Sequence, residues 1–95
     1  ADWITSQETW VSVTEGRSVS LLCRYNISAA YYVVLYWFRQ YPNKAPEYIL
    51  HRGWGNPERG VAEFALERFY SKSTANSIDL QIKNLIPADS ALYLC

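Results

Sequence analysis

The sequence has few of the residues on which metal, nucleotide and catalytic chemistry depend. It contains one histidine, two cysteines and four glycines in 95 residues. A structural zinc site needs four ligands, so the cysteines favour a disulfide over a metal site. There is no glycine-rich phosphate loop and no nucleophile motif near His51, which leaves nothing for acid–base or covalent catalysis. We therefore expect no enzyme activity, no cofactor and no bound metal.

The sequence also lacks an excess of charge and a long apolar run. Nine basic residues balance nine acidic ones and are scattered among them, whereas a protein that binds a phosphate backbone needs clustered lysine and arginine. No apolar run reaches about 18 residues, the length of a membrane-spanning helix. We expect no nucleic-acid partner, and any membrane attachment would come from sequence that is not present here.

What the sequence does contain indicates one small globular domain. Hydrophobic residues make up 49% of the chain and aromatic residues 16%. A domain of this size buries only about two-thirds of the surface that its unfolded chain exposes, so extra stabilisation is expected. A bond between Cys23 and Cys95 would close a long loop and stabilise the fold by roughly 4 kcal/mol. Such a bond implies an oxidising compartment.

Alternation of apolar and polar residues predicts a chain of short strands. Val19, Leu21 and Cys23 share one face of a strand, and Ile78 and Leu80 do the same further on. Turn residues such as Gly16 separate the strands. The predicted strands cover 4–13 with a break around 6–8, then 18–23, 33–40, 47–51, 69–71, 77–82 and 91–95. We predict loops over 26–32 and 52–57 and a helical turn over 85–90, while 61–66 is ambiguous.

The strand around Trp37 carries bulky side chains on both faces. Trp37 and Arg39 share one face, and Tyr36, Phe38 and Gln40 share the other. A soluble sheet normally has one dry face and one wet face, so an aromatic second face indicates a surface for a partner. Many short strands with a tryptophan between two cysteines predict an all-β, immunoglobulin-like sandwich of two antiparallel sheets.

Several motifs resemble one family closely. These are Cys23, the run Trp37-Phe38-Arg39-Gln40-Tyr41-Pro42, Leu80, and the run Asp89-Ser90-Ala91-Leu92-Tyr93-Leu94-Cys95. Together they resemble an immunoglobulin variable domain over the whole chain, 1–95. The second run and the segment 46–50 are more similar to T-cell receptor alpha or delta variable domains than to antibody light chains. Antibody-type, innate-receptor and adhesion modules share the remaining features and are the alternative.

The resemblance implies structural roles for several residues. Trp37 should pack against a disulfide between Cys23 and Cys95, and Leu80 should lie in the core. The Tyr93 hydroxyl should bond a backbone group upstream. Arg68 and Asp89 should form an ion pair at the bottom of the sandwich.

The resemblance also implies two binding surfaces. The partner variable domain of a heterodimer should meet Phe38, Gln40, Pro46, Tyr48 and Leu94, unless these side chains lie under the chain's own loops. Ligand recognition should come from loops over 25–32 and 50–56, through Ser28, Tyr31, Tyr32, Arg52, Trp54 and Asn56. For Trp54 the residues leave two interpretations open, a binding anchor or a side chain packed on its own sheet. The expected ligand is a peptide or other antigen on a histocompatibility molecule or a related one.

The remaining expectations concern glycosylation, the end of the sequence and the location of the protein. Asn26-Ile27-Ser28 is an acceptor sequence for N-glycosylation. The family continues beyond the second cysteine through a third variable loop and a last strand, and this sequence stops at Cys95. We expect the partner-facing sheet to have an unpaired edge there. The resemblance implies a receptor ectodomain at the cell surface.

Overall fold

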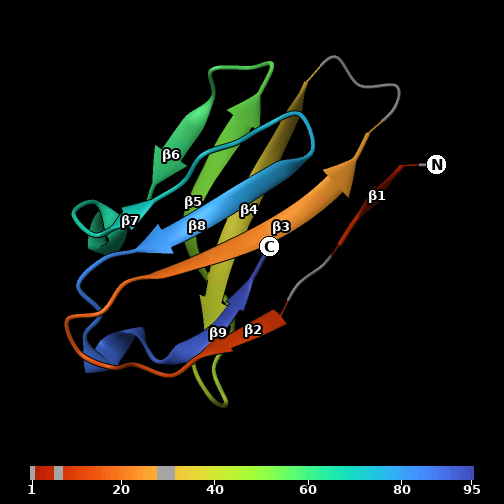
Figure 1. Ribbon diagram of the computed structural model, residues 1–95. Helices are drawn as coiled ribbons and strands as arrows, with labels where there is room; N and C mark the ends of the chain where they lie inside the picture. Colours follow the sequence, from red (N-terminus) through yellow and green to blue (C-terminus); the bar gives the residue numbers. More distant parts are fainter. Residues whose placement is uncertain (1, 6–7, 28–31) are drawn as a thin grey trace.

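The computed structural model describes residues 2–5, 8–27 and 32–95, which form two antiparallel sheets packed face to face (Figure 1). The four-stranded sheet has the order β1 (Trp3–Ile4), β3 (Val19–Asn26), β8 (Ser77–Ile82), β7 (Phe69–Tyr70). The five-stranded sheet has the order β2 (Glu8–Val11), β9 (Ala91–Leu94), β4 (Val33–Gln40), β5 (Glu47–Trp54), β6 (Arg59–Val61). Two short 3-10 helices, η1 (Glu63–Ala65) and η2 (Pro87–Asp89), lie in connections. The predicted all-β sandwich is confirmed.

The core lies between the sheets, where alternate side chains of both sheets turn inward. In β8 the inward residues Ile78, Leu80 and Ile82 are fully buried, as the alternation predicts. Trp37 of β4 is 1% exposed and belongs to the same buried cluster as Cys23. The inward face of each strand is therefore set by the period of two in its sequence.

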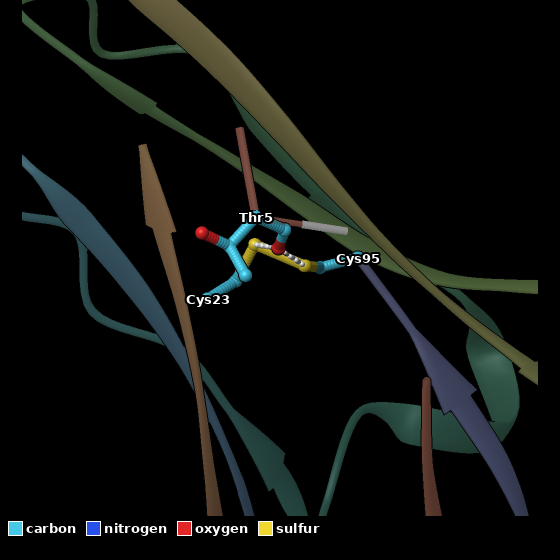
Figure 2. The surroundings of a disulfide bond; sticks show 3 residues. All are labelled: Thr5, Cys23 and Cys95. Carbon is cyan, nitrogen blue, oxygen red and sulfur yellow. Dashed lines mark hydrogen bonds between the residues drawn. A yellow bond between two sulfur atoms is a disulfide. The ribbon is translucent and has the colours of Figure 1, made fainter. Parts of the chain in front are cut away.

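A disulfide joins the two sheets. It links Cys23 of β3 to Cys95 just after β9, as Figure 2 shows. The two Cα atoms are 6.4 Å apart. The carbonyl oxygen of Thr5 lies 3.2 Å from the Cys23 sulfur and 3.5 Å from the Cys95 sulfur. A disulfide sulfur carries no proton, so these are close contacts and not hydrogen bonds. They hold the residue that follows β1 against the bridge.

A buried carboxylate organises the end of the sandwich near η2. The Arg68 guanidinium donates two hydrogen bonds to Asp89, with Nη1 2.7 Å from Oδ2 and Nη2 2.9 Å from Oδ1. Oδ2 also accepts the N–H of Ile86 at 2.9 Å. The Tyr93 hydroxyl donates to the Asp89 carbonyl oxygen at 2.7 Å. One residue thus ties β9, η2 and the segment before β7 together.

The pKa values in this cluster follow from burial and its partners. Burial alone would raise the pKa of the Asp89 carboxyl, but hydrogen bonds from Arg68 and from the Ile86 N–H, and the positive charges of Arg68 and Arg39, hold it below its ordinary value of 3.8. Burial, together with the nearby Asp89 charge, raises the pKa of Tyr93 to about 12. Asp89 is therefore charged and Tyr93 neutral at physiological pH.

Two predictions about strand ends are wrong. Tyr25 does not begin a loop, because β3 continues to Asn26 and the Tyr25 ring is 2% exposed. Its hydroxyl donates to the Thr74 carbonyl at 2.5 Å, which holds the ring inside. Leu50 does not begin the second loop either, because β5 continues to Trp54 and Leu50 is buried. In β3 the alternation of buried and exposed residues continues to Asn26. β5 is extended by its pairing with β4, which continues to Trp54 opposite Val33.

The expected unpaired edge along β9 is also not found. The first strand region divides in two, and β2 pairs antiparallel with β9 from Glu8 opposite Leu94 to Val11 opposite Ala91. β1 instead pairs with β3 in the other sheet. The backbone groups on this side of β9 are thus satisfied by β2, which relieves the cost of leaving them unpaired.

Candidate binding surfaces

The outer face of the five-stranded sheet carries a cluster of aromatic rings. We call Tyr36, Phe38, Tyr48 and His51 the aromatic face. The Tyr36 ring stacks on His51 with centroids 4.9 Å apart and lies 6.3 Å from the rings of Phe38 and Tyr48. Tyr36 is 44% exposed although it sits at the centre of the cluster. Contacts among the rings keep them in place and leave Tyr36 exposed, while the other three residues are half-buried.

A bulge in β5 brings His51 into this face. Trp37 pairs with Leu50 and Phe38 with Tyr48, so Ile49 is the extra residue in β5. Ile49 and Leu50 are consecutive and both point into the core. Strict alternation would place Tyr48 and His51 on opposite faces, and the bulge places them on the same one. Sequence reasoning therefore missed His51, and it listed Tyr48 without its neighbour.

Polar contacts and a glycine shape the edge of the aromatic face. The Tyr48 hydroxyl and His51 Nδ1 are hydrogen-bonded at 2.6 Å. Burial, and then the proximity of Tyr36, raise the pKa of Tyr48 above its ordinary value of 10.0. Gly60 of β6 lies opposite His51, and a Cβ there would come within 2.6 Å of the imidazole Cε1. The missing side chain lets the imidazole cover the β6 backbone.

The other residues predicted to meet a partner domain lie around this face. Leu94 pairs with Phe38 in the register and is partly buried. Pro46 is exposed in the β4–β5 turn. Gln40 donates its amide N–H to the Lys44 carbonyl at 2.9 Å, so half of its amide is engaged within the chain's own turn. The structure thus places Phe38, Tyr48 and Leu94 on one surface with Tyr36, and it adds His51 to them.

The predicted ligand-binding residues lie at one end of the sandwich. Val33 at the start of β4 pairs with Trp54 at the end of β5, so both lie at the same end (Figure 1). Tyr32 is 56% exposed and Trp54 45% exposed. Trp54 is outside the buried core cluster. Ser28 and Tyr31 fall outside the residues that the structure describes.

The Asn56 side chain stabilises the turn after β5. Its side-chain oxygen accepts the Glu58 N–H at 2.8 Å, and the Gly53 N–H donates to the Glu58 carbonyl at 2.8 Å. Gly55 adopts a φ of 72° between them, a conformation that glycine tolerates. A Cβ at Gly53 would lie 2.4 Å from the Asn56 carbonyl oxygen. These contacts fix the turn that presents Trp54.

Two arginines meet beside this turn. Arg52 of β5 lies directly opposite Arg59 of β6 in the register. Like charges at directly opposed positions destabilise a sheet pair. Glu58 lies near His51, 3.7 Å between its Oε1 and Nε2.

Within residues 2–5, 8–27 and 32–95 no three histidine, cysteine, aspartate or glutamate side chains come together as a metal site. The same described residues form no helix long and apolar enough to span a bilayer. What they present is an aromatic sheet face and an exposed loop end, both suited to contact with other molecules.

Comparison with known proteins identifies the family. The family model for the immunoglobulin V-set domain matches residues 6–95. The mouse T-cell receptor alpha chain V region PHDS58 is 36% identical over 100% of this chain and 70% of its own length. Human T cell receptor alpha variable 3 is 33% identical over 100% of this chain and 80% of its own length. The mouse T-cell receptor alpha chain V region 2B4 is 31% identical over 99% of this chain and 71% of its own length. The chain therefore belongs to the immunoglobulin V-set family, within its T-cell receptor alpha variable branch.

Proposed function

We propose that this chain is the antigen-recognition variable domain of a heterodimeric T-cell receptor chain of alpha or delta type. It pairs with a second variable domain through the aromatic face and contacts antigen on a histocompatibility or related molecule through its loop end. The exposed Tyr36 at the centre of four packed rings is the observation that carries the pairing. The disulfide between Cys23 and Cys95 suits an extracellular, cell-surface location, because such bonds persist in oxidising compartments.

The aromatic face has the chemistry of an interface core. Aromatic residues are enriched there and charged residues are depleted. Tyr36, Phe38, Tyr48 and His51 form a continuous set of ring contacts between 4.9 and 6.3 Å. A monomer that exposes such a patch risks nonspecific association. A second domain that covers it would bury rings that are already held in position, so little side-chain entropy is lost on binding.

Tyr36→Arg is expected to abolish pairing with a second variable domain while leaving the chain folded. The substitution would place an unpaired charge in the centre of the covered surface, at a cost of at least about 2 kcal/mol, or roughly 30-fold in affinity. Tyr70→Arg is the matched control, because Tyr70 of β7 has the same exposure of 44% and lies in the other sheet. Sedimentation analysis of the chain mixed with candidate partner domains gives the measurement. Pairing that survives in Tyr36→Arg but is lost in Tyr70→Arg would contradict the proposal.

The loop end supports recognition by a different set of side chains. Arg52 pairs with Leu35 and Trp54 with Val33, so both lie on the core-facing side of β5 but beyond the core. The aromatic face lies on the opposite side of the same strand. A partner domain and a ligand can therefore be held at the same time. Tryptophan and arginine supply large contact areas at modest entropic cost.

Trp54→Ala and Arg52→Ala are each expected to weaken ligand binding by roughly 30-fold, with little change in melting temperature. Both side chains lie beyond the core, and truncating an interface anchor costs about 2 kcal/mol. Leu22→Ala is the control, since Leu22 is 43% exposed and points outward from β3 in the other sheet. Surface plasmon resonance of the paired receptor and thermal melts give the two readouts. A fall in melting temperature without loss of affinity would favour a packing role for Trp54.

A further inference from the structure

The outer face of the four-stranded sheet carries a second exposed tryptophan that neither binding surface uses. Trp3 of β1 is 47% exposed and pairs directly with Asn26, the last residue of β3. Directly opposed residues in an antiparallel pair point to the same face, with Cβ atoms about 5 Å apart. Asn26 is itself exposed and follows the outward residues Leu22 and Arg24 of β3. An aromatic ring and an asparagine amide thus stand side by side in solvent.

Asn26 begins Asn26-Ile27-Ser28, the only Asn-x-Ser/Thr sequence in the chain. We propose that Asn26 carries an N-linked glycan whose first sugar packs on the Trp3 indole. In the transfer, the Asn26 amide nitrogen forms a bond to the anomeric carbon of a lipid diphosphate-linked oligosaccharide. The bond between that carbon and the diphosphate oxygen breaks, the diphosphate leaves with the electron pair, and the amide releases one proton.

The surroundings of Asn26 suit a sugar better than a protein partner. A shallow hollow beside it is lined by Trp3, Arg24, Ile27, Ala75 and Asn76, among others. The hydrogens on one face of a pyranose ring form an apolar surface that can lie flat on an indole. The Arg24 guanidinium and the Asn76 amide offer donors to the hydroxyl groups around the ring. One aromatic platform with polar groups at its rim is the arrangement that a monosaccharide needs.

The position of Asn26 also keeps the glycan apart from the proposed pairing surface. Asn26 lies on the outer face of the four-stranded sheet, whereas the aromatic face belongs to the five-stranded sheet (Figure 1). The two faces are on opposite sides of the sandwich. The inference therefore stands independently of the proposed heterodimer, and the glycan would cover the exposed Trp3 without blocking a partner domain.

The test uses the chain expressed behind a secretory leader in cultured animal cells, with intracellular and secreted protein pooled. We expect peptide N-glycosidase to shift the chain on a gel and to convert Asn26 to aspartate, as read by peptide mass spectrometry. Asn26→Gln and Ser28→Ala should abolish the shift, and Ser28→Thr should retain it. Unmodified Asn26 in the pooled protein would overturn the proposal.

Packing on Trp3 is tested by the stability that the glycan adds. The melting temperature of the glycosylated Ser28→Thr chain should exceed that of the unglycosylated Ser28→Ala chain by about 4 °C, the scale of one aromatic contact in a small domain. The difference should vanish when Trp3→Ala is added and persist with Trp10→Ala, a comparably exposed tryptophan in the other sheet. An equal difference in the Trp3 background would overturn the packing.

Discussion

Asp89→Asn is expected to lower the free energy of unfolding by about 3 kcal/mol, because it breaks a buried ion pair by removing one charge. Asp89 is 1% exposed and accepts two hydrogen bonds from Arg68 and one from the Ile86 N–H. An asparagine amide has the same shape but would turn its N–H₂ donors toward some of these donors. The value lies at the lower end of the range for buried pairs, since the Arg68 side chain keeps 24% exposure. Urea denaturation measures it.

The pH dependence separates loss of the ion pair from a general loss of packing. The folded-state pKa of Asp89 lies below its ordinary value. A carboxyl with a depressed pKa contributes stability that is present above its unfolded pKa, about 3.9, and is lost as the pH falls through the folded pKa. The stability gap between the wild type and Asp89→Asn should therefore narrow as the pH falls below about 4. Glu15→Gln, at an exposed acid, should leave that profile unchanged, and a gap independent of pH would contradict the assignment.

Most of the fold follows from local patterns in the sequence. The strand 77–82 and the strand 33–40 are found with the predicted bounds. In 77–82 the pattern of period two is unbroken, so the buried face can be read from the residues alone, whereas 33–40 carries bulky residues on both faces and its ends follow from the loop and turn residues that flank it. The Cys–Trp–Cys spacing then places these strands in a two-sheet sandwich. These are properties that each strand carries within its own residues.

What could not be predicted depends on contacts between segments. β5 has a bulge at Ile49 because β4 and β5 change register beside Trp37. We found no pattern in the sequence of 47–54 that predicts this bulge. The pairing of β2 with β9 depends on two segments that are far apart in the sequence. The bulge places His51 on the aromatic face. The pairing of β2 with β9 covers the β9 edge. A binding surface that spans several strands is therefore less predictable than the strands themselves.

Removing the disulfide is expected to have the largest effect on stability. For a loop of 72 residues, the separation of Cys23 and Cys95, chain-entropy arguments give about 4 kcal/mol. Domains of this kind have a total stability of only about 5 to 15 kcal/mol. The bond also ties β3 of one sheet to β9 of the other, near the Thr5 carbonyl that packs against both sulfurs. A Cys23→Ala, Cys95→Ala chain should thus be close to the limit of folding, as guanidinium denaturation would show.

A second pair of substitutions shows whether the bond acts as a tether or as packing. Cys23 is fully buried within the core cluster and Cys95 packs against it, so two alanines also remove core volume. Cys23→Val with Cys95→Ala restores most of that volume without restoring the bond. If the tether dominates, this chain should regain only about 1 kcal/mol over the alanine pair, the usual scale of a few buried methyl groups. Wild-type protein reduced with dithiothreitol should then lose nearly as much stability as the valine–alanine chain. Full recovery in the valine–alanine chain would mean that the sulfurs act by filling space, and the two sheets would then be held by apolar contacts across the core alone.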